Sequence, residues 1–208
     1  MANRRQLDNE RPDGKPIEGY IRVDPPSGEG NNDDLDISKD FKTLTLIVNS
    51  EEKKSKVRQV LPAESTTRQL YDQSLRLKVK DVAMGQNLSV LLVGGSKTSK
   101  RQTFEEIVPQ FIEALANEMI NLGNQAKNEG AKLTFLCGAT YVEILNEVVH
   151  DLLKTDNLNL NITESPVRGY EPDGCSYKGP YNDLRQLKND FARGSGNRET
   201  GHMDFGRA

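Results

Sequence analysis

One short apolar segment constrains the fold of this chain more than any other part of its sequence. Residues 88–93 (LSVLLV) are almost continuously apolar, Gly94 and Gly95 follow at once, and a Ser/Lys/Thr run then leads into a segment with helical periodicity. A nearly continuous apolar run of this length is typical of a strand buried on both faces, as in a parallel sheet. The sequence therefore predicts a central strand, a polar loop and a helix, in that order.

The rest of the chain alternates between strand and helix patterns. Strands are expected at 42–48 (KTLTLIV) and 132–142 (KLTFLCGATYV), and a surface strand at 158–162, where apolar and polar residues alternate. Helical spacing of apolar residues predicts helices around 71–82, 108–122 and 181–192, with Pro109 in the first turn of the second. Strands that alternate with helices predict an α/β fold with helices on both faces of a central sheet.

Composition sets the expected extents of the folded part. Residues 1–18 show no period of 2 or 3.6 and are predicted to be a polar tail, and 19–41 to be a weak strand followed by an acidic Gly/Asn/Asp loop. Residues 42–208 are expected to form the folded domain. Hydrophobic residues make up 35% of the chain and the mean hydropathy is −0.69, which predicts a lean core.

Composition also argues against several classes of protein. The net charge is −3, which argues against a domain held to nucleic acid by bulk positive charge. No apolar run reaches the roughly 20 residues of a membrane span. No secretory signal is expected, since the N-terminus is charged. Cys137 and Cys175 cannot form a disulfide framework or a four-ligand zinc site, and His150 and His202 are isolated. These features predict an intracellular protein without a metal site.

The loop after the apolar run is the candidate binding site. A P-loop has the pattern GxxxxGK[ST] between a strand and a helix, and here Gly94 and Lys100 have the required spacing. Ser99 replaces the second glycine, where a positive φ would cost roughly 1 kcal/mol or more. Arg101 replaces the hydroxyl residue, and a guanidinium cannot bind Mg²⁺ because it has only donors. Gly94, Gly95, Ser99, Lys100 and Arg101 are therefore predicted to form a degenerate P-loop, and Lys100 and Arg101 to be mainly solvated.

Residues 141–153 (YVEILNEVVHDLL) closely resemble a signature of the kinesin motor domain, E-I-x-N-E followed by D-L-L. Other segments resemble kinesin motifs in the family's order: 85–87 the G-Y-N before the P-loop strand, 107–109 the I-I-P of the next helix, and 196–198 the end of G-x-x-N-R. The resemblance extends from about residue 42 to 208 and implies a P-loop-type sheet, here an incomplete kinesin-like motor core.

The resemblance also implies what is missing. The family's next motif, S-S-R-S-H, and the later D-x-x-G do not follow within these 208 residues, and the R-x-R-P that contacts adenine is absent. Phosphoryl transfer needs a metal ligand, the switch serine and a water-positioning group together. We therefore expect a chain that is not an enzyme, has no cofactor, and binds ATP or ADP poorly.

The expected function is that of a non-motile structural or docking protein in a microtubule-based assembly, with the ciliary axoneme as the suggested setting. Its expected location is the cytoplasm and cytoskeleton, with the axoneme of a cilium or flagellum as the suggested specific site. Its expected partners are tubulin or microtubule-associated proteins, in an obligate complex. No binding to nucleic acid or membrane is expected. Residues 68–101 carry seven basic side chains against two acidic ones, which suits an acidic partner or an ordinary charged surface equally. The alternatives are a nucleotide-binding regulator and a weak ATPase completed by a partner chain.

Overall fold

The computed structural model describes residues 17–25, 34–95, 98–166, 169–181 and 183–198. The chain divides into two compact units, Met1–Thr66 and Thr67–Ala208, which are described separately below. The boundaries expected from the sequence, a tail at 1–18, a weak strand with an acidic loop at 19–41 and a motor-like domain at 42–208, remain predictions. The predicted polar tail, 1–18, lies outside the described residues except for positions 17 and 18.

The first unit consists of two small sheets. Strand β1 (Tyr20–Arg22) pairs in parallel with β5 (Gln59–Leu61), while β2 (Leu35–Ile37), β3 (Thr43–Val48) and β4 (Glu51–Lys56) form an antiparallel sheet in that order. The strand predicted at 42–48 is thus confirmed as β3. The expected acidic loop is partly wrong, because β2 forms within it by pairing its backbone with β3.

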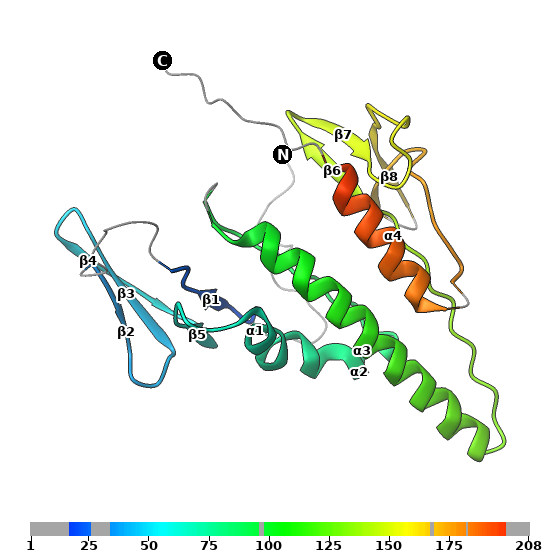
Figure 1. Ribbon diagram of the computed structural model, residues 1–208, viewed down its shortest axis with the longest axis horizontal. Coiled ribbons are helices and arrows are strands. Elements are labelled where there is room, and N and C mark those ends of the chain that lie inside the picture. The colour runs from blue at the N-terminus through cyan, green and yellow to red at the C-terminus, as the bar shows by residue number, and fades with distance from the viewer. Residues whose placement is uncertain (1–16, 26–33, 96–97, 167–168, 182, 199–208) are drawn as a thin grey trace. The chain divides into compact units, whose positions relative to one another are not determined.

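The second unit begins with short helical segments and contains the longest helix. Its elements are α1 (Thr67–Gln73), η1 (Leu75–Lys78), α2 (Val79–Ala83), α3 (Lys100–Asn128), β6 (Val142–Leu145), β7 (Val148–Asp151), β8 (Ile162–Ser165), β9 (Gly169–Pro172) and α4 (Leu184–Asn197). Figure 1 shows α4 lying along α3, and Lys188 Nζ on α4 is 3.1 Å from Glu113 Oε2 on α3.

An aromatic cluster forms the core between α3, α4 and the approach to β6. The ring of Tyr141 stacks on Phe191 with centroids 5.5 Å apart, and Phe104 meets Phe191 edge-on, also at 5.5 Å. Val149, Leu152 and Leu153 are buried as well. The motif that carried the resemblance therefore contributes directly to the core of this unit.

Two predicted strands do not form ladders within the described residues. Residues 88–93 carry no strand, and Leu91 and Val93 are 85% and 81% exposed. Of the strand expected at 132–142, only Val142 joins an extended ladder, and Ala139 makes an isolated bridge with Lys178. A strand buried on both faces needs a neighbour on each edge, and none of the described segments supplies one to 88–93. The α/β class is confirmed, while the central sheet is only partly built.

Two other expectations also differ from the structure. The helix expected at 108–122 begins eight residues earlier, at Lys100, so Pro109 lies inside α3 rather than in its first turn. The surface strand expected at 158–162 is wrong in position: Leu160 makes an isolated bridge with Val149, and β8 begins at Ile162. Periodicity located helices α3 and α4 but did not fix where the elements begin and end.

Candidate functional site

The side chain of Lys100 binds to the backbone of its own loop. Its Nζ donates to the carbonyl oxygen of Gly94 at 2.5 Å, to the carbonyl oxygen of Gly95, and to Thr98 Oγ1 at 3.3 Å. Thr98 Oγ1 also donates to the Gly95 carbonyl at 2.9 Å. Lys100 is half-buried rather than mainly solvated. Its ammonium would have to give up these carbonyls to pair with an anion.

Gly94 is needed here for close packing rather than for its backbone angles. A Cβ at this position would lie 2.8 Å from Thr98 Oγ1 and 3.3 Å from Lys100 Cδ. Real Cβ atoms essentially never approach a neighbour as closely as 2.8 Å, so a side chain at residue 94 would require the Thr98 hydroxyl to move. The Gly94–Lys100 spacing, which singled out this loop in the sequence, therefore corresponds to a direct contact.

Ser99 carries none of the backbone strain expected for it. It is the N-cap of α3 with φ −72°, in the ordinary right-handed range, and its carbonyl accepts from Thr103 N at 2.8 Å. The strain argument assumed that the loop would follow the P-loop path, in which the second glycine has a positive φ. With a helical φ at this position, a Cβ is tolerated.

Arg101 pairs along its own helix. Its Nε lies 2.8 Å from Glu105 Oε1, one turn further on, and its side chain is half exposed. This bond and the charge of Glu105 raise the pKa of Arg101, with smaller contributions from Glu143 and Tyr141. At the position where a P-loop has a metal-binding hydroxyl, this structure has a cation with donors only. The residues of this loop therefore do not fit Mg²⁺.

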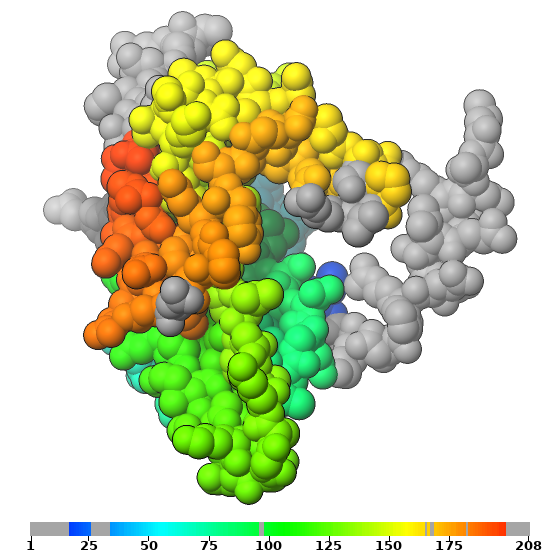
Figure 2. All heavy atoms as spheres, turned by 90° about the vertical axis from the view of Figure 1, so that its right-hand side faces the viewer, coloured from blue at the N-terminus to red at the C-terminus, as the bar shows by residue number. Residues whose placement is uncertain are grey.

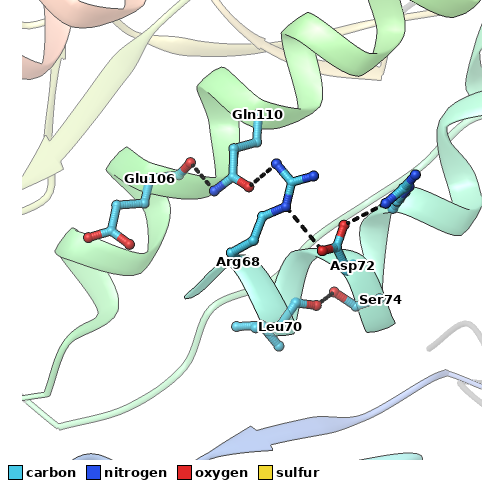
Figure 3. Close-up of polar contacts among 7 residues, drawn as sticks. Arg68, Leu70, Asp72, Ser74, Glu106 and Gln110 are labelled. Carbon is cyan, nitrogen blue, oxygen red and sulfur yellow. Dashed lines mark hydrogen bonds and ion pairs between the residues drawn. The ribbon is translucent and has the colours of Figure 1, made fainter. Parts of the chain in front are cut away.

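A second candidate surface lies on the helices before the loop. Asp72 accepts from Arg68 Nε at 3.0 Å and from Arg76 Nη1 at 3.1 Å, so one carboxylate bridges two guanidinium groups on successive turns. Arg68 also donates to Gln110 Oε1 on α3 at 3.3 Å, as Figure 3 shows. Both arginine side chains are about 60% exposed, at 61% and 62%. This helical surface therefore presents exposed arginine side chains to the solvent.

Asp151 organises a region that sequence reasoning overlooked. The residue is 1% exposed. Its carboxylate accepts from the backbone N–H groups of Leu153 (2.9 Å), Lys154 (3.2 Å) and Ser176 (2.7 Å), and from Asn157 Nδ2 (3.2 Å). Burial raises the pKa of Asp151, but these bonds outweigh it and hold the pKa below its usual value. Figure 2 shows the orange residues after β9 lying against the yellow residues around position 150. An acidic residue that opens an apolar D-L-L run is the signal that could have revealed it.

The end of α4 returns to the same region. Asn197 Nδ2 donates to the Leu152 carbonyl at 2.9 Å, and Tyr141 Oη lies 3.2 Å from Ser195 Oγ. Residues 196–198 and 141–153, which were picked out separately in the sequence, therefore meet in space. Within the described part of the chain, no cluster of three His, Cys, Asp or Glu side chains could hold a metal ion.

Among the helices described, none is long and apolar enough to cross a membrane. Cys137 and Cys175 are both free and half-buried, and burial raises the pKa of each thiol. Neither cysteine is paired with a histidine among the contacts described.

The loop, the signature hairpin and the mixed α/β architecture together resemble one family. A sequence profile of the kinesin motor domain matches residues 26–207, and the chain belongs to this family. It is 28% identical over 129 residues to Kinesin-related protein 3 of Dictyostelium discoideum, covering 56% of this chain and 10% of that protein. It is 28% identical over 139 residues to Kinesin-like protein KIF22 of Danio rerio, covering 66% of this chain and 22% of that protein.

The fold agrees with this assignment. The chain superposes with a TM-score of 0.69 on the solved structure of a fast kinesin, at 17% sequence identity, covering 87% of this chain and 52% of that one. The resemblance stated from the sequence and the motor-type fold class are therefore confirmed. The chain spans about half of the solved kinesin and a smaller part of the curated relatives, so activity and partners of those whole proteins are not carried over as findings.

The expectation that this domain is not an enzyme is wrong at the level of the family. The solved fast kinesin is described as having an ATPase mechanism and interactions with microtubules, and this chain belongs to the same family. The expectation rested on the residues at positions 99 and 101 and on motifs that do not follow. Departures at two positions of one loop are compatible with descent from, and membership in, a family of ATPases.

Proposed function

We propose that this chain is a kinesin-type docking domain in a microtubule-based assembly, where partner contacts hold it in place rather than a cycle of steps along the filament. The observation that carries the proposal is the pairing of Arg101 with Glu105 at the position of the metal-binding hydroxyl. A motor hydrolyses its nucleotide with the help of a metal ion bound to the phosphates. Residue 101, where that metal would be held, is an arginine and offers no metal ligand.

The basic face on α1, η1 and α2 supports docking to an acidic partner. Arg76, Lys78 and Lys80 follow one another within two turns; Asp72 pairs with Arg76, and Asp81 is the acidic residue of α2. Acidic filament surfaces such as tubulin attract such a face through long-range electrostatics, with a marked dependence on salt. The cytoskeleton of the cytoplasm is the proposed location, the ciliary axoneme the proposed specific setting, and an obligate complex the proposed state.

Charge reversal tests this proposal. The triple variant Arg76→Glu, Lys78→Glu and Lys80→Glu should lose most co-sedimentation with microtubules and its normal localisation in cells, whereas Lys100→Ala should keep both. Reversal of Lys53, Lys54 and Lys56 provides a control with the same change in charge, placed on the exposed strand β4 instead of the helical segments. Retained binding in the first triple variant together with loss in Lys100→Ala would overturn the proposal.

A second candidate keeps the chemistry of the family. Gly94 and Lys100 retain P-loop spacing, so the alternative is a nucleotide-binding regulator or a weak ATPase completed by a partner chain. Under this alternative, Lys100 would exchange the Gly94 carbonyl for a phosphate. Under the docking proposal, Mg-ATP binds weakly at most. Calorimetry decides between them: micromolar Mg-ATP affinity that disappears in Lys100→Ala would support the nucleotide-dependent alternative.

A further inference from the structure

Segments η1 and α2 follow one another without a break and are buried on one side only. Val79 is buried, and Leu75 and Val82 are half-buried at four and three residues from it. The exposed residues of this helical run are Arg76, Leu77, Lys80, Asp81 and Met84. Residues three, four and seven positions apart lie on one side of a helix, so these five form a single exposed row, which we call the outer stripe.

Two residues of the outer stripe are large and apolar. Leu77 and Met84 are 69% and 65% exposed. They lie seven residues apart, and seven residues of helix rise about 10 Å, so the two side chains stand about two turns from each other. Single exposed apolar side chains are common on protein surfaces. Two at this spacing, on an otherwise charged stripe, have the arrangement of the anchors through which one helix contacts another.

The surroundings of these two anchors are mainly cationic. Residues 68–84 carry four basic side chains against the acidic Asp72 and Asp81. Asp72 pairs with both Arg68 and Arg76, at 3.0 and 3.1 Å, yet the two arginines stay 61% and 62% exposed. A partner that covers the outer stripe therefore meets a net positive surface, and it gains most from this surface if it carries carboxylates.

The chemistry of the stripe decides which kind of partner fits it. Its backbone is engaged within the helix, as in the 2.9 Å bond from Met84 N to the Lys80 carbonyl, so an added β-strand would gain no backbone pairing. A second copy of the same stripe would bring like charges together. An anionic membrane would be repelled by Asp81, which lies between the two anchors.

An acidic amphipathic helix avoids each of these costs. Its apolar residues can pack against Leu77 and Met84 at the same seven-residue spacing. Its carboxylates can lie beside Arg76 and Lys80, and an uncharged or basic residue can lie opposite Asp81. The outer stripe therefore fits this partner by both its apolar spacing and its charge.

We propose that the outer stripe is a docking site for an acidic amphipathic helix of a partner protein, with Leu77 and Met84 as the apolar anchors. The proposal rests on the docking role of the proposed function and deepens it, because it states which kind of element contacts the basic face. Charge speeds the encounter and the anchors slow dissociation, so the association rate should fall with salt, whereas the dissociation rate should rise when the anchors are removed.

A designed peptide tests the outer stripe on the full 208-residue chain. The probe is a fluorescein-labelled helical peptide of glutamate and alanine with two leucines seven positions apart, and fluorescence anisotropy measures its binding. The variant Leu77→Gln with Met84→Gln keeps the net charge and should weaken binding at least about tenfold. The matched control, Ile120→Gln with Leu136→Gln, alters positions that are 61% and 79% exposed and should bind like the wild-type chain.

A second peptide of the same composition, with its two leucines on opposite sides of the helix, should bind at least about tenfold more weakly than the first. Equal binding of the two peptides, or no binding of either, would overturn the proposal. So would full binding by the Leu77→Gln/Met84→Gln variant. Anchor-dependent binding to phosphatidylserine vesicles in place of the peptide would assign the stripe to a membrane, and an anchor-dependent dimer would assign it to a second copy.

Microtubule co-sedimentation separates this proposal from the proposed function. Loss of sedimentation in the Arg76→Glu, Lys78→Glu and Lys80→Glu variant, but not in Leu77→Gln/Met84→Gln, would keep the docking role and reject the apolar anchors. Anchor-dependent peptide binding without any binding to microtubules would reject the microtubule partner and keep the outer stripe as a site for an acidic helix. Loss of sedimentation in both variants would support both proposals.

Discussion

Arg198 and Glu143 form an ion pair that joins the end of α4 to strand β6, with Arg198 Nε 3.0 Å from Glu143 Oε1. The two side chains are 30% and 12% exposed, so the pair is largely shielded from water. Glu143 belongs to the E-I-x-N-E motif and Arg198 ends the G-x-x-N-R motif, 55 residues later in the sequence. The pair therefore connects two segments that resemble the family independently.

A double-mutant cycle on Arg198→Ala and Glu143→Gln should give a coupling energy of about 1–2 kcal/mol, because the charges are shielded and the bond is charge-assisted. Urea unfolding of the four proteins measures it. Lys54 and Glu52 are the matched control, since they are also 3.0 Å apart but 63% and 64% exposed. Their coupling should stay below about 0.5 kcal/mol. Equal couplings for the two pairs would contradict the role given to burial.

Asp151 should make stability sensitive to acid. Its pKa in the folded protein is lowered from the ordinary 3.8, so the folded state favours the ionised form. The stabilisation is therefore complete above the ordinary pKa and is lost as the pH falls through the folded pKa. Melting temperatures measured from neutral pH downward should fall steeply below about pH 4.

Asp151→Asn should lower stability at neutral pH by about 2–3 kcal/mol, because the amide cannot accept all four bonds, and the acid-induced fall should be shallower. Asp156→Asn in the adjoining loop is the control, since Asp156 is exposed, and it should melt like the wild-type protein at neutral pH. If the melting temperature of Asp151→Asn falls with pH as steeply as that of the wild-type protein, another group causes the loss of stability in acid.

Two glycines in α4 should respond to alanine in opposite directions. A Cβ at Gly194 would lie 2.4 Å from the Tyr141 ring, whereas a Cβ at Gly196 would meet nothing within 4 Å. Helix propensity alone favours alanine by up to about 1 kcal/mol at either site. Gly196→Ala should therefore stabilise slightly, and Gly194→Ala should destabilise by about 1–3 kcal/mol through overpacking. Thermal melting of both variants checks the sign, and stabilisation by Gly194→Ala would mean that α4 is not held against Tyr141.

The contacts of Lys100 can be tested through its chemical reactivity. Because its ammonium is engaged by the carbonyls of Gly94 and Gly95, acetic anhydride should label Lys100 more slowly than the exposed Lys80. Gly94→Ala displaces Thr98 and should speed labelling of Lys100 several-fold, without changing Lys80. Quantitative mass spectrometry of the labelled peptides gives both rates in one sample. Equal rates for the two lysines in the wild-type protein would show that the loop is open in solution.

Patterns confined to one segment predicted the structure well. The β-branched run at 43–48 forms β3, and the four- and three-residue spacing from Tyr71 to Val82 marks a helical region, although it is broken into α1, η1 and α2. The long signature at 141–153 identified the family because its order of residue types is hard to match by chance.

Long-range pairing could not be read in the same way. Residues 88–93 have the composition of a buried strand, but burial depends on neighbours that composition does not reveal. Likewise, the helical φ of Ser99 and the contacts of Lys100 depend on the path of the loop, which spacing alone leaves open. The role of Asp151 was overlooked because it also holds Ser176, which lies 25 residues later in the sequence.

The carboxylate of Asp151 links the local unfolding of two surface segments. Its Oδ1 accepts from the backbone of Leu153 and Lys154, and its Oδ2 accepts from both Asn157 Nδ2 and Ser176 N. Asn157 Nδ2 also donates to the Gly174 carbonyl at 2.8 Å. Neither segment can detach without removing partners from the other, so both should become accessible to proteases in the same opening event. Cleavage near 154 and cleavage near 178 should therefore occur at the same rate, because one local unfolding event exposes both loops to the protease.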